Sequence, residues 1–328
     1  MFVKFFGFLA GAIRLSATFL YGSTGEIITE KSGHLNLGIP GVMSVGAAIG
    51  CLSEYYLIKS IGTSVPFLLI LVPLLVTFIG SALMGLLYSF LTVSLRANQN
   101  VTGLAMTTFG VGLAGYLINS IKGKMAVITR ASKYFTTLFP FADKLGWFGE
   151  IFLSHGVLVY LAILIAIIAQ LVLNRTRVGL HLRAVGESPA TADAAGISVT
   201  KYKYLATCLG AGISGLGGLY YVLDYNQGIW ATTTQIEALG WLAVALVIFT
   251  TWKPLNAIWG SYLFGLLYWL YQFLPTLLHI SVPGYVTDLI QMVPYLVTIV
   301  VLVVTSLRKK RENQPPASLG LAYFREER

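Results

Sequence analysis

The chain has 328 residues, of which 56% are hydrophobic and 11% are charged. A soluble globular domain carries about 25% charged residues, so this chain has too few to cover a surface that faces water. The formal net charge is +9. Its Lys and Arg residues lie in short connections between apolar runs, a distribution typical of membrane topology and not of a nucleic-acid-binding patch.

A membrane-spanning helix needs about 20 predominantly apolar residues. Pro73 and Gly80 could divide one long apolar run, and the Gly-rich segment 33–50 is compatible with a broken helix buried in protein, so we expect about eight to ten spans. We predict an all-α, polytopic transmembrane bundle over residues 1–306. Its spans are expected at residues 5–22, 35–57, 65–93, 100–121, 155–173, 205–224, 237–251, 254–278 and 285–306.

Basic residues in short loops indicate the cytoplasmic side. The connection 174–204 and the tail 307–328 are both rich in them, so we place both in the cytoplasm, with the tail flexible because it is polar and contains prolines. The predicted spans then put the N-terminus and the loop 122–153 outside. That loop conflicts with the rule, since it carries Lys122, Lys124, Arg130, Lys133 and Lys144.

The string GEIITEKSGHLNLGIPGVMSVGAAIG, residues 25–50, places acidic and basic residues just ahead of the Gly-rich apolar run of the second span. Gly46 and Gly50 form a small-xxx-small pair that favours close contact between helices. Asn36 is a candidate polar lining group for a solute path. Plain helix packing is the alternative interpretation of the glycines.

The centre of the 174–204 connection reads AVGESPATADAAGI. Ser188 and Pro189 suit the N-cap and first position of a helix, and Gly196 suits the residue that ends it. The predicted short helix has small side chains that could enter a groove on a partner, with Glu187 and Asp193 available to meet basic groups. An ordinary cytoplasmic loop is the alternative.

The strings SGHLNLGIPGVMSVGA (32–47) and LRAVGESPATADAAGI (182–197) resemble those of bacterial ABC importer permeases of the simple-sugar and branched-chain amino-acid superfamily. The nucleoside (guanosine-type) permeases are most similar, and ANQNVTGLAM (97–106) resembles them more weakly. Two residues depart from the pattern: Pro40 stands where the family usually has Glu, and His34 where it usually has a small or apolar residue. The matched family positions near the second span are Asn36, Leu37, Gly38, Gly41 and Met43.

The resemblance implies a permease subunit of the bacterial cytoplasmic membrane that imports a nucleoside-type polar solute, with a simple sugar as the alternative. It implies three protein partners: an ABC ATPase subunit, a second homologous permease and an extracellular lipid-anchored binding protein. The permease itself would be no enzyme and would bind no cofactor, since the ATPase uses the ATP. The residues implied to couple it to the ATPase are Gly186, Glu187, Pro189, Ala190, Asp193, Ala194, Gly196 and Ile197.

A path for a nucleoside or sugar needs amide or hydroxyl groups and an aromatic face. By residue type alone, the candidates are Asn98, Gln99, Asn119, Gln235 and Trp241.

Polar residues inside apolar spans are functional candidates by default. Most of those in this chain lie near predicted span ends, where interface solvation satisfies them. An ion-coupled secondary transporter, which would place such groups deep in the bundle, is therefore disfavoured. A membrane-embedded enzyme is also disfavoured, since acids do not cluster and the histidines lack metal-ligand spacing. The intramembrane candidates are Arg14, Glu54, Asn119, Asp224, Glu237 and Asp288.

Overall fold

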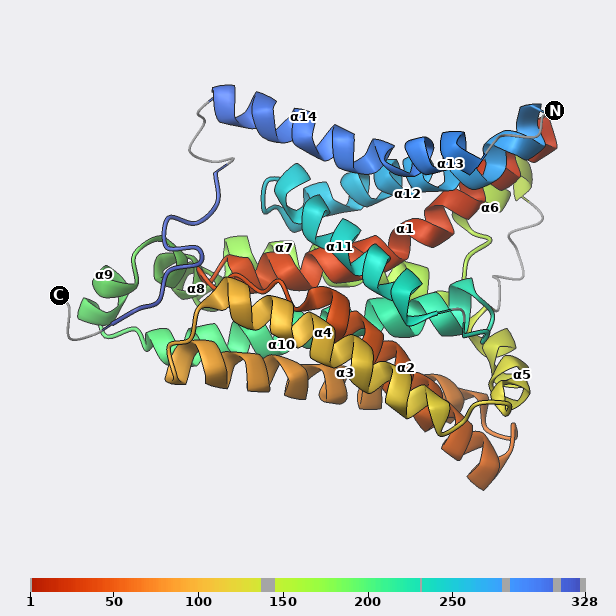
Figure 1. Ribbon diagram of the computed structural model, residues 1–328, viewed down its shortest axis with the longest axis horizontal. Coiled ribbons are helices and arrows are strands. Elements are labelled where there is room, and N and C mark those ends of the chain that lie inside the picture. Colours follow the sequence, from red (N-terminus) through yellow and green to blue (C-terminus); the bar gives the residue numbers. More distant parts are fainter. Residues whose placement is uncertain (1, 137–144, 231, 279–283, 309–313, 325–328) are drawn as a thin grey trace.

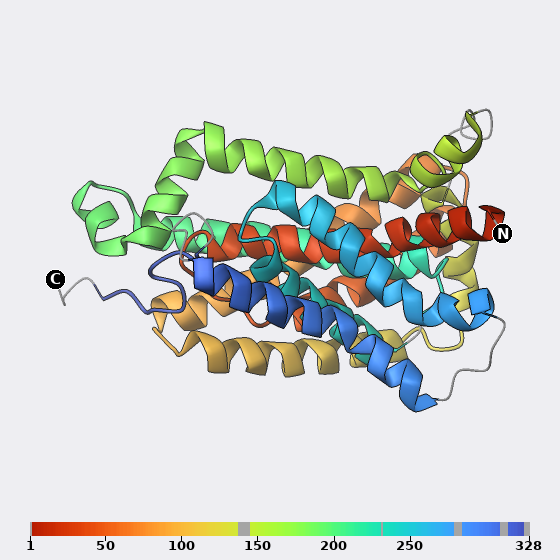
Figure 2. The same ribbon diagram turned by 90° about the horizontal axis from the view of Figure 1, so that it is seen from above.

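The computed structural model describes residues 2–136, 145–230, 232–278, 284–308 and 314–324. Over these residues the chain is an elongated bundle of helices that run along one long axis (Figures 1 and 2). The described residues contain helices and turns and no strand, which confirms the predicted all-α class.

Each predicted span overlaps a helix. The long segments are α1 (Phe2–Glu30), α2 (Ile39–Ile61), α3 (Pro66–Ser89) with the π-helical turn η1 (Phe90–Ser94), α4 (Gln99–Asn119), α7 (Val157–Arg175), α10 (Val199–Tyr220) with η3 (Tyr221–Tyr225), α11 (Thr233–Phe249), α12 (Pro254–Leu278), and α13 (Gly284–Gln291) with α14 (Val293–Arg308). The short helices are α5 (Met125–Phe135), α6 (Gly146–Phe152), α8 (Arg177–Glu187) and α9 (Pro189–Ala194). Among the described residues, five helices are long and apolar enough to cross a membrane: α2, α3 with η1, α4, α7, and α10 with η3.

The structure decides the continuity of the first three predicted spans. The helix α1 continues past the predicted end of its span, residue 22, to Glu30. The Gly-rich segment does not break α2: a short linker ends at Gly38, and α2 begins at Ile39 with Pro40 in its first turn, where a missing N–H group costs no helical hydrogen bond. The helix α3 also runs unbroken through Pro73.

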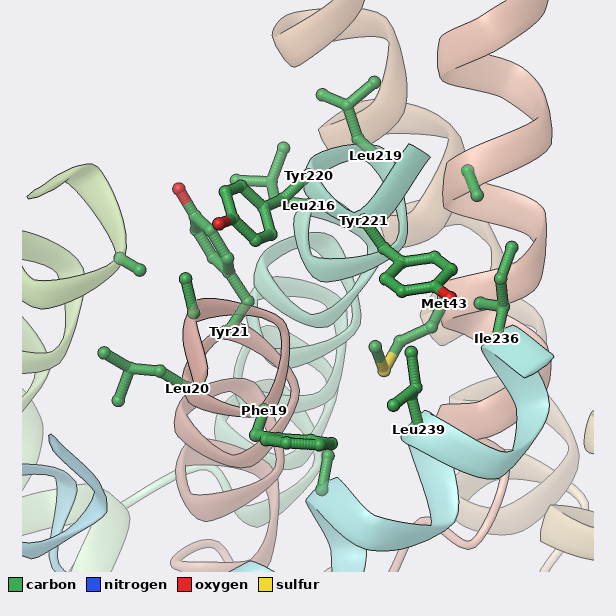
Figure 3. Packing of buried hydrophobic residues seen from close by; sticks show 14 of the residues in the cluster. Phe19, Leu20, Tyr21, Met43, Leu216, Leu219, Tyr220, Tyr221, Ile236 and Leu239 are labelled. Carbon is green, nitrogen blue, oxygen red and sulfur yellow. The ribbon is translucent and has the colours of Figure 1, made fainter. Parts of the chain in front are cut away.

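Glycines bring the central helices into close contact. A Cβ atom on Gly46 of α2 would lie 2.5 Å from the carbonyl oxygen of Gly215 on α10, and one on Gly50 would overlap Leu219. The packing interpretation of the Gly46–Gly50 pair is therefore confirmed. Around this contact, α1, α2, α10 and α11 share a core in which Tyr21 and Tyr220 face one another, with ring centroids 6.2 Å apart (Figure 3).

The outer faces of several long helices are apolar and exposed. Examples are Phe67 and Leu83 on α3, Leu171 on α7 and Val300 on α14. A water-soluble protein rarely exposes contiguous apolar faces of this kind. They fit a bundle whose solvent is lipid.

The two ends of the bundle are distinct. The N-terminus, α5 and α6 lie at one end, whereas α8, α9 and the C-terminus lie at the other (Figure 1). The described parts of the loop 122–153 are thus opposite the 174–204 connection, as the predicted topology requires. Lys144 lies outside the described residues.

Candidate functional site

The helix predicted in the 174–204 connection is present as α9. The Ser188 side chain caps it by accepting a hydrogen bond from the Thr191 amide at 3.4 Å, and Pro189 is its first residue. At the other end Gly196 has φ +79°. The amides of Gly196 and Ile197 donate to the carbonyl oxygens of Asp193 and Ala192, at 3.0 Å each, which is the Schellman arrangement of a helix end. Local capping thus defines both ends.

The helix α9 is fastened to the spanning helix α10. Val185 of α8, Ala192 of α9 and Val199 of α10 form a small buried cluster. His181 of α8 bonds through Nδ1 to the Tyr202 hydroxyl of α10, at 2.8 Å. The side chains that remain exposed around α9 include those of Glu187, Ala190, Thr191 and Ala194. A displacement of α9 by a partner bound to this exposed face would therefore be transmitted to α10 through the packed side chains.

The structure brings the two strings of the family resemblance together. Gly186, at the end of α8, lies against the linker between α1 and α2: a Cβ atom there would overlap the Lys31 carbonyl oxygen and lie 3.1 Å from the Gly33 amide nitrogen. Gly33 has φ +75°, a conformation that glycine adopts without strain. Both glycines are therefore required by one close backbone contact.

The matched positions near α2 hold this linker in place. The backbone N–H of Asn36 donates to Glu26 Oε1 at 2.9 Å. The side-chain Oδ1 of Asn36 accepts from the backbone N–H of Gly38, also at 2.9 Å. The Leu37 carbonyl accepts from Thr107 Oγ1 at 2.8 Å. The other two matched positions also pack closely, with Gly41 against α4 and Met43 buried in the core. Asn36 thus organises the start of α2 in this structure.

The two departures from the family pattern occupy structural positions. His34 is buried in the linker, with Nδ1 2.7 Å from Thr207 Oγ1 and Nε2 2.7 Å from Thr92 Oγ1. Burial, aided by the charge of Lys203, lowers the pKa of His34 to about 3, so its ring is neutral at physiological pH. Pro40 packs against Gly240 of α11.

A cavity of about 670 Å³ with a mixed polar and apolar lining opens among α1, α6, η3, α11 and α12. Its lining includes Arg14, Gln235 and an aromatic group. The Tyr221 and Tyr225 rings stack with centroids 5.5 Å apart and 16° between their planes. Trp269 meets the Tyr225 ring edge-on, at 6.3 Å. The site combines flat aromatic surface with amide and guanidinium donors, the groups that a polar ring compound requires.

Of the five path candidates, Gln235 lines this cavity and accepts a bond from the Tyr221 hydroxyl at 3.4 Å. Asn98 caps α4, Asn119 is exposed at the end of α4, and Trp241 is half-buried on α11. Gln99 accepts from the Leu35 amide at 2.8 Å and donates to the Leu321 carbonyl at 3.2 Å. The structure thus places those four away from the cavity.

Interface solvation is the wrong explanation for two of the intramembrane acids. Asp224 is 1% exposed, and its Oδ1 lies 3.8 Å from Arg14 Nη2. Glu54 is fully buried, and neither of its carboxylate oxygens has a hydrogen-bond partner among the described residues. Asn119 is exposed and Glu237 is half-buried, as expected near span ends. The side chain of Asp288 lies outside the described part of the chain.

Sequence reasoning missed other members of these sites. Glu26 and Glu30 are buried on α1, and Trp252 Nε1 donates to Glu30 Oε2. The sequence places both among the charged residues ahead of the second span, because the predicted first span ends at residue 22. Their spacing of four, with no proline between them, was the available signal of one helix face. The spacing of four between Tyr221 and Tyr225 gave the same signal for the cavity wall.

The sequence profile described as "Branched-chain amino acid transport system / permease component" matches residues 8–302. This chain belongs to that permease family. The permease is accordingly an integral membrane component of an ABC transporter.

Three relatives cover most of the permease. It is 33% identical to the putative glucose ABC transporter permease protein TsgC13 of Haloferax volcanii, over 80% of this chain and 75% of the relative. It is 30% identical to the guanosine ABC transporter permease protein NupQ of Bacillus subtilis, over 76% and 77% of the two chains. It is also 30% identical to the nucleoside ABC transporter permease protein NupC of Lactococcus lactis, over 90% of each. No solved structure matches the permease significantly.

Proposed function

We propose that this permease forms the translocation path of an importer for nucleosides, driven by ATPase subunits that dock on α9. The observation that carries the substrate class is the cavity beside Arg14, where stacked aromatic rings and the Gln235 amide stand together. Nucleobases stack on aromatic side chains with about 1–3 kcal/mol per base. The relatives named for guanosine and nucleosides support the same class.

A simple sugar is the second candidate. The relative named for glucose is 33% identical over 80% of this chain, and sugars also bind with amide donors and an aromatic face. Both solutes would use the same cavity. They differ in that only the nucleobase carries an aromatic ring to stack on Tyr225 or Trp269.

The coupling step rests on the exposed face of α9. Small side chains at Ala190 and Ala194 allow close approach of a partner, and α9 shares a buried cluster with α8 and α10. ATP binding and hydrolysis in the separate ATPase subunits would move α9, and the packed cluster would transmit the movement to α10 as a rigid body. The permease would alternate between outward-open and inward-open states without being an enzyme itself.

We assign the external binding protein and the second permease to surfaces of this chain from the same orientation in the membrane. With α9 in the cytoplasm, α5 and α6 lie at the outer end of the bundle (Figure 1). The cavity lies toward the same end, since Glu150 of α6 is part of its lining. Trp147 and Phe148 of α6 are exposed there and offer a surface to an external, lipid-anchored binding protein. A second homologous permease would pair with this chain to complete the path.

Buried acids by themselves would also fit an ion-coupled secondary transporter. Glu26, Glu30, Glu54 and Asp224 are all buried. Family membership argues against that alternative, because ABC permeases draw energy from an ATPase. In this proposal three of these acids are structural: Glu26 accepts from the linker, Glu30 accepts from Trp252, and Asp224 pairs with Arg14.

Uptake of labelled solutes by cells that lack this chain tests the substrate class. Loss of guanosine uptake with glucose uptake intact is the expected result. The opposite outcome would assign the permease to sugars, and loss of neither would reject both.

A reconstituted complex tests the coupling role. The variant Ala190→Glu places a charge on the exposed face of α9 and should lower ATPase co-purification and uptake at least about tenfold. Ala126→Glu, at an exposed alanine on α5, is the matched control and should retain the ATPase. Gly186→Arg is unsuitable as a test, because a side chain at Gly186 would clash with the Lys31 carbonyl oxygen and destabilise the fold.

A further inference from the structure

Part of the chain beyond α14 packs against the rest of the protein. Residues 314–324, here called the strap, return from α14 and lie along α8 and α9 (Figure 1). Ser318 is buried, and its amide and hydroxyl donate to the Gly186 carbonyl at 3.0 and 2.6 Å. The expected flexible tail is therefore wrong for these residues. The basic residues at 309–311 lie outside the described part.

The far end of the strap reaches α9 itself. The Tyr323 hydroxyl donates to Asp193 Oδ2 at 2.8 Å. The Tyr323 ring packs on the cluster of Val185, Ala192 and Val199. Tyr323 thus adds an aromatic ring from the strap to the buried cluster that holds α9 in place.

Two further contacts tie the strap to the membrane helices. Gln99 Nε2 donates to the Leu321 carbonyl, and the Arg96 guanidinium lies over the Phe324 ring, with Cζ 4.9 Å from its centroid. Arg96 lies after η1, and Gln99 opens α4. The strap consequently bridges the coupling element on one side and the α3–α4 connection on the other.

We infer that the strap positions α9 for the ATPase, with Tyr323 as its positioning residue through Asp193. This inference rests on the proposed coupling role of α9. The exposed face of α9 docks the ATPase, while the opposite face is held by Tyr323 and the buried cluster. Without the strap, α9 keeps its caps and its contacts with α8 and α10 but loses the Tyr323 ring and its bond to Asp193, so ATP hydrolysis continues while less of its movement reaches the bundle.

The test measures uptake and ATP hydrolysis together in proteoliposomes that contain the whole transporter. Tyr323→Phe removes one hydroxyl and keeps the ring, so the fold is preserved. It should raise the ATP consumed per guanosine imported by about threefold to tenfold, the range of one net hydrogen bond. Deletion of residues 314–328 should raise this ratio further. Tyr116→Phe, at an exposed tyrosine on α4, is the matched control and should leave the ratio unchanged.

A double-mutant cycle identifies Asp193 as the partner. If one bond accounts for both effects, Tyr323→Phe combined with Asp193→Ala should change the ratio no more than the larger single change. Multiplication of the two effects would contradict the assigned contact. An unchanged ratio in both Tyr323→Phe and the deletion would overturn the inference.

The α9 variant separates the two levels of the hypothesis. If Ala190→Glu abolishes coupling while the strap variants do nothing, the strap inference fails alone. If Ala190→Glu also leaves ATPase binding and uptake intact, the proposed coupling role of α9 fails with it.

Discussion

Arg14 on α1 and Asp224 in η3 form an ion pair beside the aromatic cavity, with Arg14 Nη2 3.8 Å from Asp224 Oδ1. The carboxylate is 1% exposed and the guanidinium side chain 30% exposed. Arg14 Nη2 also donates to the Asp224 carbonyl at 3.3 Å. The cavity wall therefore depends on a contact between residues 210 positions apart.

Removing Arg14 should destabilise the bundle more than removing both partners. Arg14→Met leaves a buried carboxylate without its counter-charge and should cost about 3 kcal/mol. Arg14→Met combined with Asp224→Leu should recover part of that loss, because no buried charge remains. Thermal unfolding in detergent, followed by Trp fluorescence, measures the difference. Lys59→Met, at an exposed position on α2, is the control; a double variant less stable than Arg14→Met would contradict the account.

The aromatic wall of the cavity should determine affinity for a nucleobase. Tyr225→Leu removes the flat ring beside Trp269 and should weaken guanosine binding by about tenfold, as expected for one base stack. Tyr225→Phe keeps the ring and should bind nearly as tightly. Isothermal titration or uptake KM measures the effect. Trp259→Leu, on an exposed face of α12, should be neutral; equal affinity in Tyr225→Leu and wild type would remove this cavity from the path.

Glycines that look alike in sequence should respond differently to alanine. Gly186→Ala forces a methyl group against the Lys31 carbonyl, where neither backbone can yield without moving the linker, and should cost about 2 kcal/mol or more. Gly196→Ala meets no atom within 4 Å but must adopt φ +79°, at a cost of about 1 kcal/mol. Gly112→Ala, in open space on α4, should be neutral or stabilising by about 0.5–1 kcal/mol. Detergent melting curves rank the three variants, and a reversed order would refute the packing at Gly186.

Acid should destabilise the fold through His34. Its folded-state pKa is about 3, whereas an unfolded chain has an ordinary value of about 6.5. Between these values the unfolded state binds a proton that the folded state does not, so stability is full above about pH 6.5 and falls as the pH drops toward 3. Burial also lowers the pKa of His155, ahead of α7, to about 4, which adds to the loss over most of the same window.

Melting temperatures measured from pH 7.5 to 4.5 check this dependence. The variant His34→Gln should be less stable at pH 7.5, because it disturbs the bonds to Thr92 and Thr207, but its stability should fall less steeply with acid. His155→Gln should flatten the curve in the same sense. A slope as steep as that of wild type in the double variant would show that neither histidine is responsible.

Local chemistry was enough to predict some features. Each predicted span overlaps helical segments, although the last span is divided into α13 and α14, because a bilayer requires an apolar run of about 20 residues whatever its neighbours are. The helix α9 was predicted with its cap, its proline and its terminal glycine, since these act within a few residues. The resemblance strings identified the permease family before any tertiary contact was known.

Tertiary structure decided the features that depend on distant residues. Hydropathy ends a span at its first acids, yet α1 continues through Glu26 and Glu30, which accept hydrogen bonds from the Asn36 backbone N–H and the Trp252 indole. Composition makes residues 314–324 a flexible tail, yet Gly186 and Asp193 provide the partners that order them. Of the polar path candidates, Gln235 reaches the aromatic cavity. Sequence determined which segments enter the membrane, whereas only the fold could supply the partners that make buried polar groups and an ordered tail stable.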